Sequence, residues 1–158
     1  MTAQDLPEHA NDLVLTRLFD IPADRLYRCW TEPALIQQWF APSPWSVARV
    51  DNDVRPGGHS LIVMRSPEGQ EMPGSGVYLE VIPNRRLVFT DAFTQGWVPA
   101  DKPFMTGIVT FDPEGSQTRY TARVRHWNAA DRAQHEAMGF HSGWGQCAAQ
   151  LAELAARL

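Results

Sequence analysis

Apolar and polar positions alternate over much of the first 127 residues, in short runs separated by turn residues. Residues 12–20 (DLVLTRLFD) carry apolar side chains in both registers, which is typical of a strand with both faces partly covered. Farther along, Pro-Gly-Gly at 56–58, Pro-Glu-Gly at 67–69 and Pro-Asn at 83–84 interrupt the apolar runs with residues that favour tight turns. The runs around these turns predict further antiparallel strands at 45–54, 59–65, 76–82, 86–93, 104–111 and 116–127.

A helical period replaces this alternation in two regions. Residues 23–31 and 33–40 predict two short helices, each preceded by residues that favour a helix start. From Asn128 to Leu158, apolar side chains recur at spacings of three and four, which predicts one long amphipathic helix. Three glycines interrupt this helix, and a loop followed by a helix start near Gly139 is the alternative.

The order of these elements predicts the fold class. A strand, two short helices, six strands and a long helix indicate an α+β protein with helices on one face of an antiparallel sheet. We expect a curved sheet of about seven strands, including the N-terminal one, wrapped on the C-terminal helix and enclosing a cavity. We further expect a flexible tail at residues 1–11, an irregular loop at 95–103 and a single domain at 12–158.

Four segments resemble motifs of a known group of proteins. They are EP followed by QWF within 32–40, DVRPGG at 53–58, GVYLEVIPNRRLVFT at 76–90, and Gly143-Trp144 followed by two leucines within 143–154. Together they resemble the helix-grip fold of the START-like, or SRPBCC, superfamily, and within it the family homologous to activators of the ninety-kilodalton heat-shock chaperone ATPase. The resemblance covers residues 12–158 and implies the fold described above. It does not imply one activity, because ligand carriers, cyclases, hydroxylase domains and chaperone cofactors share this fold.

Charge and composition exclude several classes of function. The chain has 18 acidic and 14 basic residues, without the concentrated basic face that nucleic-acid binding requires. Arg119, Arg123 and Arg125 fit the solvated face of a strand. No run approaches the ~18 apolar residues of a membrane span, and we expect a cytoplasmic protein. Cys29 and Cys147 form no CxxC pair, so we expect reduced thiols, no metal site and no cofactor.

Aromatic residues supply the main candidate for a binding site. The 6 Trp, 7 Phe and 3 Tyr are spread over elements that a helix-grip fold brings together, and aromatic walls with a few polar groups are typical of small-ligand sites. Alternatively, these side chains simply fill the core. The predicted cavity residues are Trp30, Trp39, Phe40, Met64, Tyr78, Phe89, Asp91, Trp97, Phe104, Tyr120, His126, Met138, His141 and Trp144.

Polar residues within this set suggest what the cavity could do. His126 and His141 could reach one end of it, where an imidazole orients a ligand or acts as a base. Asp91 would be a candidate acid or base if it faced the cavity. No GxSxG elbow or metal-ligand spacing is present, so we expect no catalytic residue.

The favoured function is the binding of a small apolar or amphipathic molecule. The alternatives are a co-chaperone-like protein-interaction module, using the sheet exterior or loop 95–103, and a cavity enzyme of the isomerase, cyclase or hydrolase type. Eukaryotic activators of the chaperone ATPase carry an additional N-terminal domain without a counterpart in this sequence, which argues against a chaperone partner. A homodimer through a free sheet edge is a further alternative.

Overall fold

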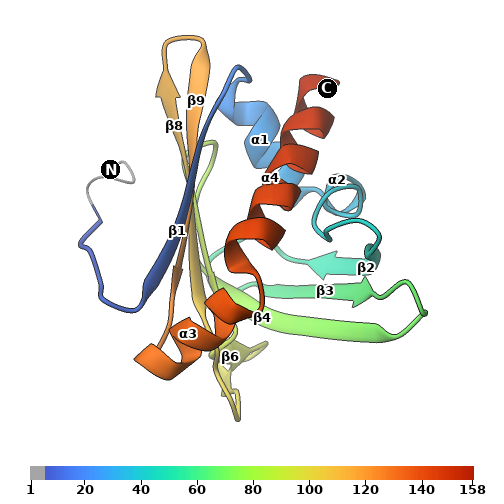
Figure 1. Ribbon diagram of the computed structural model, residues 1–158, viewed down its shortest axis with the longest axis vertical. Coiled ribbons are helices and arrows are strands. Elements are labelled where there is room, and N and C mark those ends of the chain that lie inside the picture. The colour runs from blue at the N-terminus through green and yellow to red at the C-terminus, as the bar shows by residue number, and fades with distance from the viewer. Residues whose placement is uncertain (1–5) are drawn as a thin grey trace.

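A seven-stranded antiparallel sheet frames the molecule in the computed structural model, which describes residues 6–158 (Figure 1). The strand order is β1-β9-β8-β5-β4-β3-β2, so the N-terminal strand and the second strand form the two edges. The strands are β1 (Asp12–Phe19), β2 (Ser46–Asn52), β3 (His59–Arg65), β4 (Glu71–Ile82), β5 (Arg86–Thr90), β8 (Thr106–Glu114) and β9 (Gln117–Arg125). The predicted α+β class and the seven-stranded sheet are confirmed.

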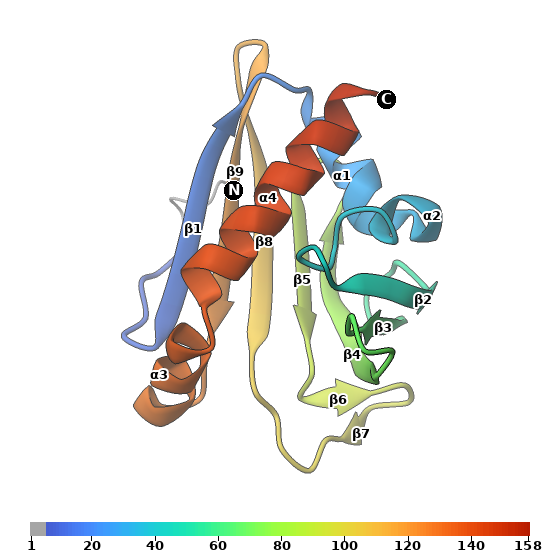
Figure 2. The same ribbon diagram turned by 45° about the vertical axis from the view of Figure 1, so that its right-hand side comes forward.

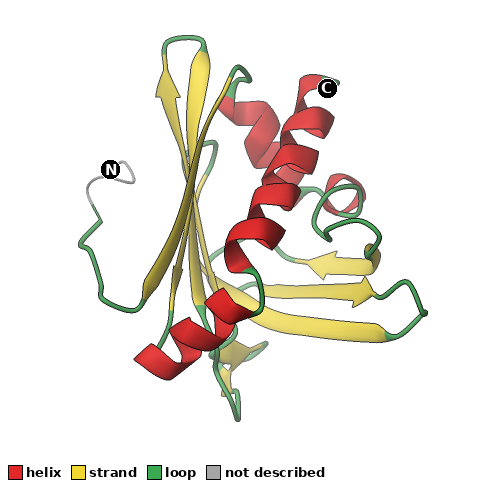
Figure 3. Cartoon of the chain, in the orientation of Figure 1, coloured by secondary structure: helices red, strands yellow, loops and turns green. Residues whose placement is uncertain are grey.

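Four helices complete the fold within residues 6–158, and Figure 2 shows the longest of them crossing in front of the curved sheet, while Figure 3 shows it beside the strands. Two short helices follow β1: α1 (Ala23–Thr31) has the predicted bounds, whereas α2 (Pro33–Ile36) begins as predicted but ends at Ile36 instead of residue 40. Two more, α3 (Ala129–Ala137) and α4 (Phe140–Ala156), close the chain. Because α4 packs on both α1 and β1, it holds the sheet and the short helices around one core.

The C-terminal helix is divided, in contrast to the continuous helix predicted from residue 128. Asn128 caps α3 as expected, because its side chain accepts a hydrogen bond from the Asp131 amide at 2.8 Å. The division falls at Gly139, whose φ of 95° lies in the left-handed region that glycine adopts most easily. The chain therefore turns between α3 and α4, and the two helices take different directions (Figure 2).

Two strand predictions also need correction. Strand β4 begins at Glu71 instead of residue 76, because its first half pairs with β3 from Arg65↔Glu71 onward. That half has no partner on its other side, since β5 pairs only with Val77–Ile82, and Pro73 is tolerated at such an edge. Within the predicted loop 95–103, β7 (Val98–Pro99) pairs with β6 (Phe93–Thr94) as a separate hairpin.

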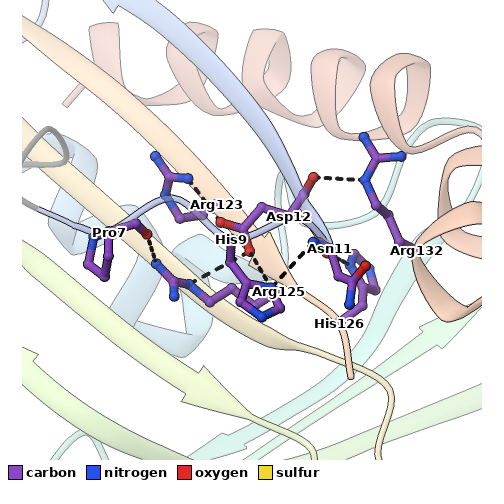
Figure 4. Close-up of polar contacts among 8 residues, drawn as sticks. All are labelled: Pro7, His9, Asn11, Asp12, Arg123, Arg125, His126 and Arg132. Atoms are coloured by element: carbon purple, nitrogen blue, oxygen red, sulfur yellow. Dashed lines mark hydrogen bonds and ion pairs between the residues drawn. The ribbon is translucent and has the colours of Figure 1, made fainter. Parts of the chain in front are cut away.

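The segment before β1 is hydrogen-bonded to the end of β9 and the residue after it (Figure 4). Arg125 donates a hydrogen bond to the Pro7 carbonyl at 2.6 Å, and the His126 amide donates to the Asn11 carbonyl at 3.2 Å. Residues 1–5 of the predicted flexible tail lie outside the described residues. No helix within residues 6–158 is long and apolar enough to cross a membrane.

Candidate functional site: an aromatic cavity beneath the C-terminal helix

A cavity of about 220 Å³ lies between the sheet and α4. Side chains from α1, the α2–β2 connection, β3, β9 and both C-terminal helices line it. Seven of the predicted cavity residues contribute to its wall: Trp30, Trp39, Phe40, Met64, Tyr120, Met138 and Trp144. Met138 is 69% exposed, so the cavity reaches solvent at the end of α3.

Trp30 is the centre of the aromatic wall. Its ring lies 5.0 Å from that of Trp39 and 5.7 Å from that of Phe40, both in edge-to-face arrangements that favour aromatic pairs. The indole N–H of Trp30 donates to the Tyr120 hydroxyl at 3.3 Å, and that of Trp39 donates to the Cys29 carbonyl at 2.8 Å. Because both indole donors are already bonded within the protein, the two rings offer the cavity mainly apolar carbon.

Two further hollows adjoin this cavity. One of about 340 Å³ is lined in part by Phe40, Met64, Phe89 and Phe104, and one of about 30 Å³ is lined in part by Trp30, Phe40 and Tyr78. Phe40 borders all three spaces. This half-buried ring therefore forms part of the boundary between the three spaces.

Asp91 borders the larger hollow, but its carboxylate already has partners. Its Oδ1 accepts hydrogen bonds from the Phe104 amide at 2.9 Å and from the Met105 amide at 3.1 Å. These bonds hold the chain where it enters β8. The geometry therefore supports an anchoring role for this carboxylate.

Two other predicted residues lie away from the cavity. Trp97 is 55% exposed on the β6–β7 hairpin, where its ring packs against Phe93 with 5.9 Å between centroids. His141 is exposed and directs its Nε2 to Glu136 at 3.0 Å. Neither side chain belongs to the wall of any of the three hollows.

The structure pairs His126 with His135, a residue absent from the sequence prediction. His126 Nε2 lies 2.9 Å from His135 Nδ1, and the two residues are only 3% and 9% exposed. The His135 ring forms part of the cavity wall beside Phe140 and Trp144, at centroid distances of 5.2 and 6.4 Å. The other wall residues missed from sequence are Pro42, Gly139, Phe140, Gly143 and Cys147.

Burial keeps the titratable groups of this wall neutral at pH 7. It lowers the pKa of His135 from 6.5 to about 4, with a smaller contribution from neighbouring His126. Burial also raises the pKa of the Cys147 thiol to about 11 and raises the pKa of the Tyr120 phenol. A protonated thiol is a poor nucleophile, and no Lys, Arg, Asp or Glu of the described chain lines this cavity. The wall therefore presents no charged side chain to the cavity at pH 7.

No cluster of three His, Cys, Asp or Glu side chains within residues 6–158 has the arrangement of a metal site. The wall instead offers ring carbons, methionine thioethers and a few neutral polar groups. Sites of this composition hold small molecules mainly through apolar contact, and their few polar groups fix orientation.

Comparisons with known proteins place the chain among relatives of similar length. Protein NE0264 from Nitrosomonas europaea is 42% identical, with a TM-score of 0.91, over 95% of this chain and 97% of that one. Protein Ms6760 from Mycobacterium smegmatis is 26% identical, with a TM-score of 0.77, over 90% of this chain and 89% of that one. Protein CV1439 from Chromobacterium violaceum is 25% identical, with a TM-score of 0.73, over 93% and 98% of the two chains.

A family model agrees with these structural matches. The model described as "Activator of Hsp90 ATPase homolog 1-like protein" matches residues 20–156. None of the curated proteins matches this chain.

Proposed function

The chain belongs to the family of activator of Hsp90 ATPase homolog 1-like proteins, and we propose that it binds a small, uncharged, largely apolar molecule in the cavity beneath α4. Family membership confirms the resemblance seen in the sequence, but the fold is shared by proteins of different function. The proposal therefore depends on the site itself. The observation that carries it is an aromatic cavity with a neutral wall and adjoining hollows.

Apolar contact would supply most of the affinity. Burial of apolar surface contributes roughly 25 cal/mol per Å², so about 2.5 kcal/mol for every 100 Å² that a ligand removes from water. The Trp30, Trp39 and Trp144 rings offer flat faces for such contact. A charged ligand would have to give up its hydration without an opposite charge on the wall, which is strongly unfavourable.

A fluorescent probe and one blocking substitution test this proposal. The neutral probe N-phenyl-1-naphthylamine should bind the wild-type protein saturably, with a rise in its emission. Gly143 lines the cavity, and a Cβ placed there meets no atom within 4 Å. Gly143→Leu should therefore fill the space and abolish binding, whereas Ala149→Leu on the exposed face of the same helix should leave binding unchanged.

Native mass spectrometry of freshly purified protein gives a second measurement. A retained small molecule in the wild type that is lost in Gly143→Leu would support the proposal and provide the mass of the ligand. The proposal is rejected if the probe fails to saturate the wild type and no small molecule co-purifies. It is also rejected if the two leucine variants bind the probe equally.

The β6–β7 hairpin supports a second candidate function, which is contact with a chaperone. Trp97 and Val98 are 55% and 56% exposed at this hairpin, and the family is described by activators of the chaperone ATPase. Purified chain added to the ninety-kilodalton heat-shock chaperone should then raise its rate of ATP hydrolysis, and Trp97→Ala should reduce that rise. An unchanged rate with the wild-type chain rejects this candidate.

A further inference from the structure

The hydrogen bonds of His126 and His135 define where their protons lie. His126 Nδ1 is 2.7 Å from the Asn11 carbonyl oxygen. Because a carbonyl oxygen can only accept a hydrogen bond, this nitrogen must carry a proton. In a neutral imidazole the other nitrogen, Nε2, is then a lone-pair acceptor. His135 Nδ1, 2.9 Å away, must therefore be the donor between the two rings.

In the alternative arrangement both ring nitrogens of His126 would carry a proton, and the ring would be a further cation among several arginines. Figure 4 shows Arg123, Arg125 and Arg132 in the same cluster as His126. The negative charge in this cluster is the buried Asp12 carboxylate, which is 3.0 Å from Arg123 Nη1 and 3.7 Å from Arg125 Nε.

Helix α3 adds further charged groups to this cluster. Arg132 donates to the Asp12 backbone carbonyl at 3.0 Å and faces Glu136 at 3.5 Å. Glu136 in turn pairs with His141 on the exposed side of the helix. The cluster thus already holds more positive than negative groups, and an imidazolium in this buried position would add to the excess.

A neutral pair leaves one nitrogen of His135 free to accept. With its proton on Nδ1, neutral His135 has a lone pair on Nε2, and no residue within 6–158 donates a hydrogen bond to that atom. The ring is nine-tenths buried and belongs to the wall of the main cavity. Because this atom has no donor among those residues, a molecule bound in the cavity can supply one.

Each of the other two polar side chains of the wall makes one hydrogen bond within the protein. The Tyr120 oxygen accepts from the Trp30 indole N–H at 3.3 Å, and the Cys147 thiol lies 3.5 Å from the Phe40 carbonyl as a donor. These contacts leave His135 Nε2 as the acceptor best placed to recognise a ligand. The hydrogen bonds between Asn11 and His126 and between His126 and His135 hold the His135 ring in one orientation.

We propose that His135 Nε2 accepts a hydrogen bond from the ligand, and that the cavity selects uncharged molecules carrying a hydroxyl or N–H donor on an apolar body. This inference rests on the proposed binding function and specifies its ligand class. The apolar wall supplies affinity that similar hydrocarbons would share. The single acceptor distinguishes those that can donate from those that cannot.

A pair of matched probes tests this selection at pH 7.5 by equilibrium dialysis. 2-Naphthol is uncharged at this pH and can donate, whereas 2-methoxynaphthalene has the same ring system without a donor. The wild type should bind 2-naphthol about three- to tenfold more tightly. His135→Asn keeps a side-chain N–H close to the position of Nδ1 and removes Nε2, so this preference should fall to about one.

The matched control is His141→Asn, which removes an exposed histidine from the same region. It should keep the wild-type preference for 2-naphthol. Equal binding of the two probes by the wild type overturns the inference and leaves the proposed function standing. Saturable binding of neither probe contradicts the proposed function itself. A preference that survives His135→Asn also overturns the inference.

A measurement without ligand or substitution reads the proton positions directly. Imidazole nitrogen spectra of protein labelled with ¹⁵N-histidine distinguish a protonated ring nitrogen from an unprotonated one. Both His126 and His135 should carry their proton on Nδ1 at pH 7.5. Detection of a proton on His135 Nε2 overturns the inference, whatever the probes or the stability of the variant show.

Discussion

Acidification should destabilise this protein through His135. In the folded state, burial and the neighbouring His126 lower the pKa of this imidazole from 6.5 to about 4. Between these two pH values the unfolded chain binds the proton more readily than the folded chain, so stability falls as the pH falls. The contribution is fully present above pH 6.5 and is lost as the pH falls toward about 4.

The size of the effect follows from the pKa values. The difference between 6.5 and about 4 corresponds to about 3 kcal/mol in total. About 2 kcal/mol of this is lost between pH 7 and pH 5. Since a domain of this kind is stable by roughly 5–15 kcal/mol, such a loss is easily measured.

Urea unfolding followed by tryptophan fluorescence at pH 7, 6, 5 and 4 provides the assay. Other groups titrate in this range, so the useful quantity is the wild-type free energy of unfolding minus that of His135→Asn. This difference should shrink by about 2 kcal/mol between pH 7 and pH 5. His141→Asn should follow the wild type. A difference that stays constant from pH 7 to pH 4 would refute the reasoning, because His135 would then titrate alike in both states.

Two further substitutions test the packing around the site and the N-terminal anchor. Gly143→Ala should raise the free energy of unfolding by up to about 1 kcal/mol, and the melting temperature by about 2–4 °C in calorimetry, because the added methyl meets open space inside a helix. A lower melting temperature would show that this space is not free. Asp12→Asn should cost roughly 3 kcal/mol in urea unfolding, because it leaves Arg123 and Arg125 without their buried counter-charge. A loss below about 0.5 kcal/mol would show that the cluster is screened by solvent.

The fold could be predicted because its signals are local. Helix α1 begins and ends at the predicted residues, Ala23 and Thr31, and strand β3 does so at His59 and Arg65. In both segments the apolar period and the flanking turn residues agree. Strand β4 shows where such reasoning fails. Residues 71–75 contain a proline and a glycine, which predict a turn, yet pairing with β3 extends the strand through them.

The candidate site was harder to predict, because it depends on one change of direction in the backbone. At about 100° per residue, His135 would lie roughly opposite Trp144 around a continuous helix. Read in that way, the histidine faces away from the apolar stripe. The left-handed conformation of Gly139 ends α3 and changes the helix direction, so both rings reach the same cavity. Glycine at this position was the available signal, but its backbone angle could not be known from sequence.

The same turn separates the parts that hold the fold together from the part that we propose distinguishes ligands. Much of the apolar wall comes from α1, β9 and α4, whose side chains Trp30, Tyr120 and Phe140 also belong to the core. The polar end is formed by α3 and the residue after β9, and Asn11 and Asp12 anchor it through His126 and Arg132. These anchors bond to backbone carbonyls, and they add to the ring contacts with Phe140 and Trp144 that orient His135. Under the proposed binding, a change of this one side chain of α3 would alter selectivity for a donor while the core side chains of the wall stay in place.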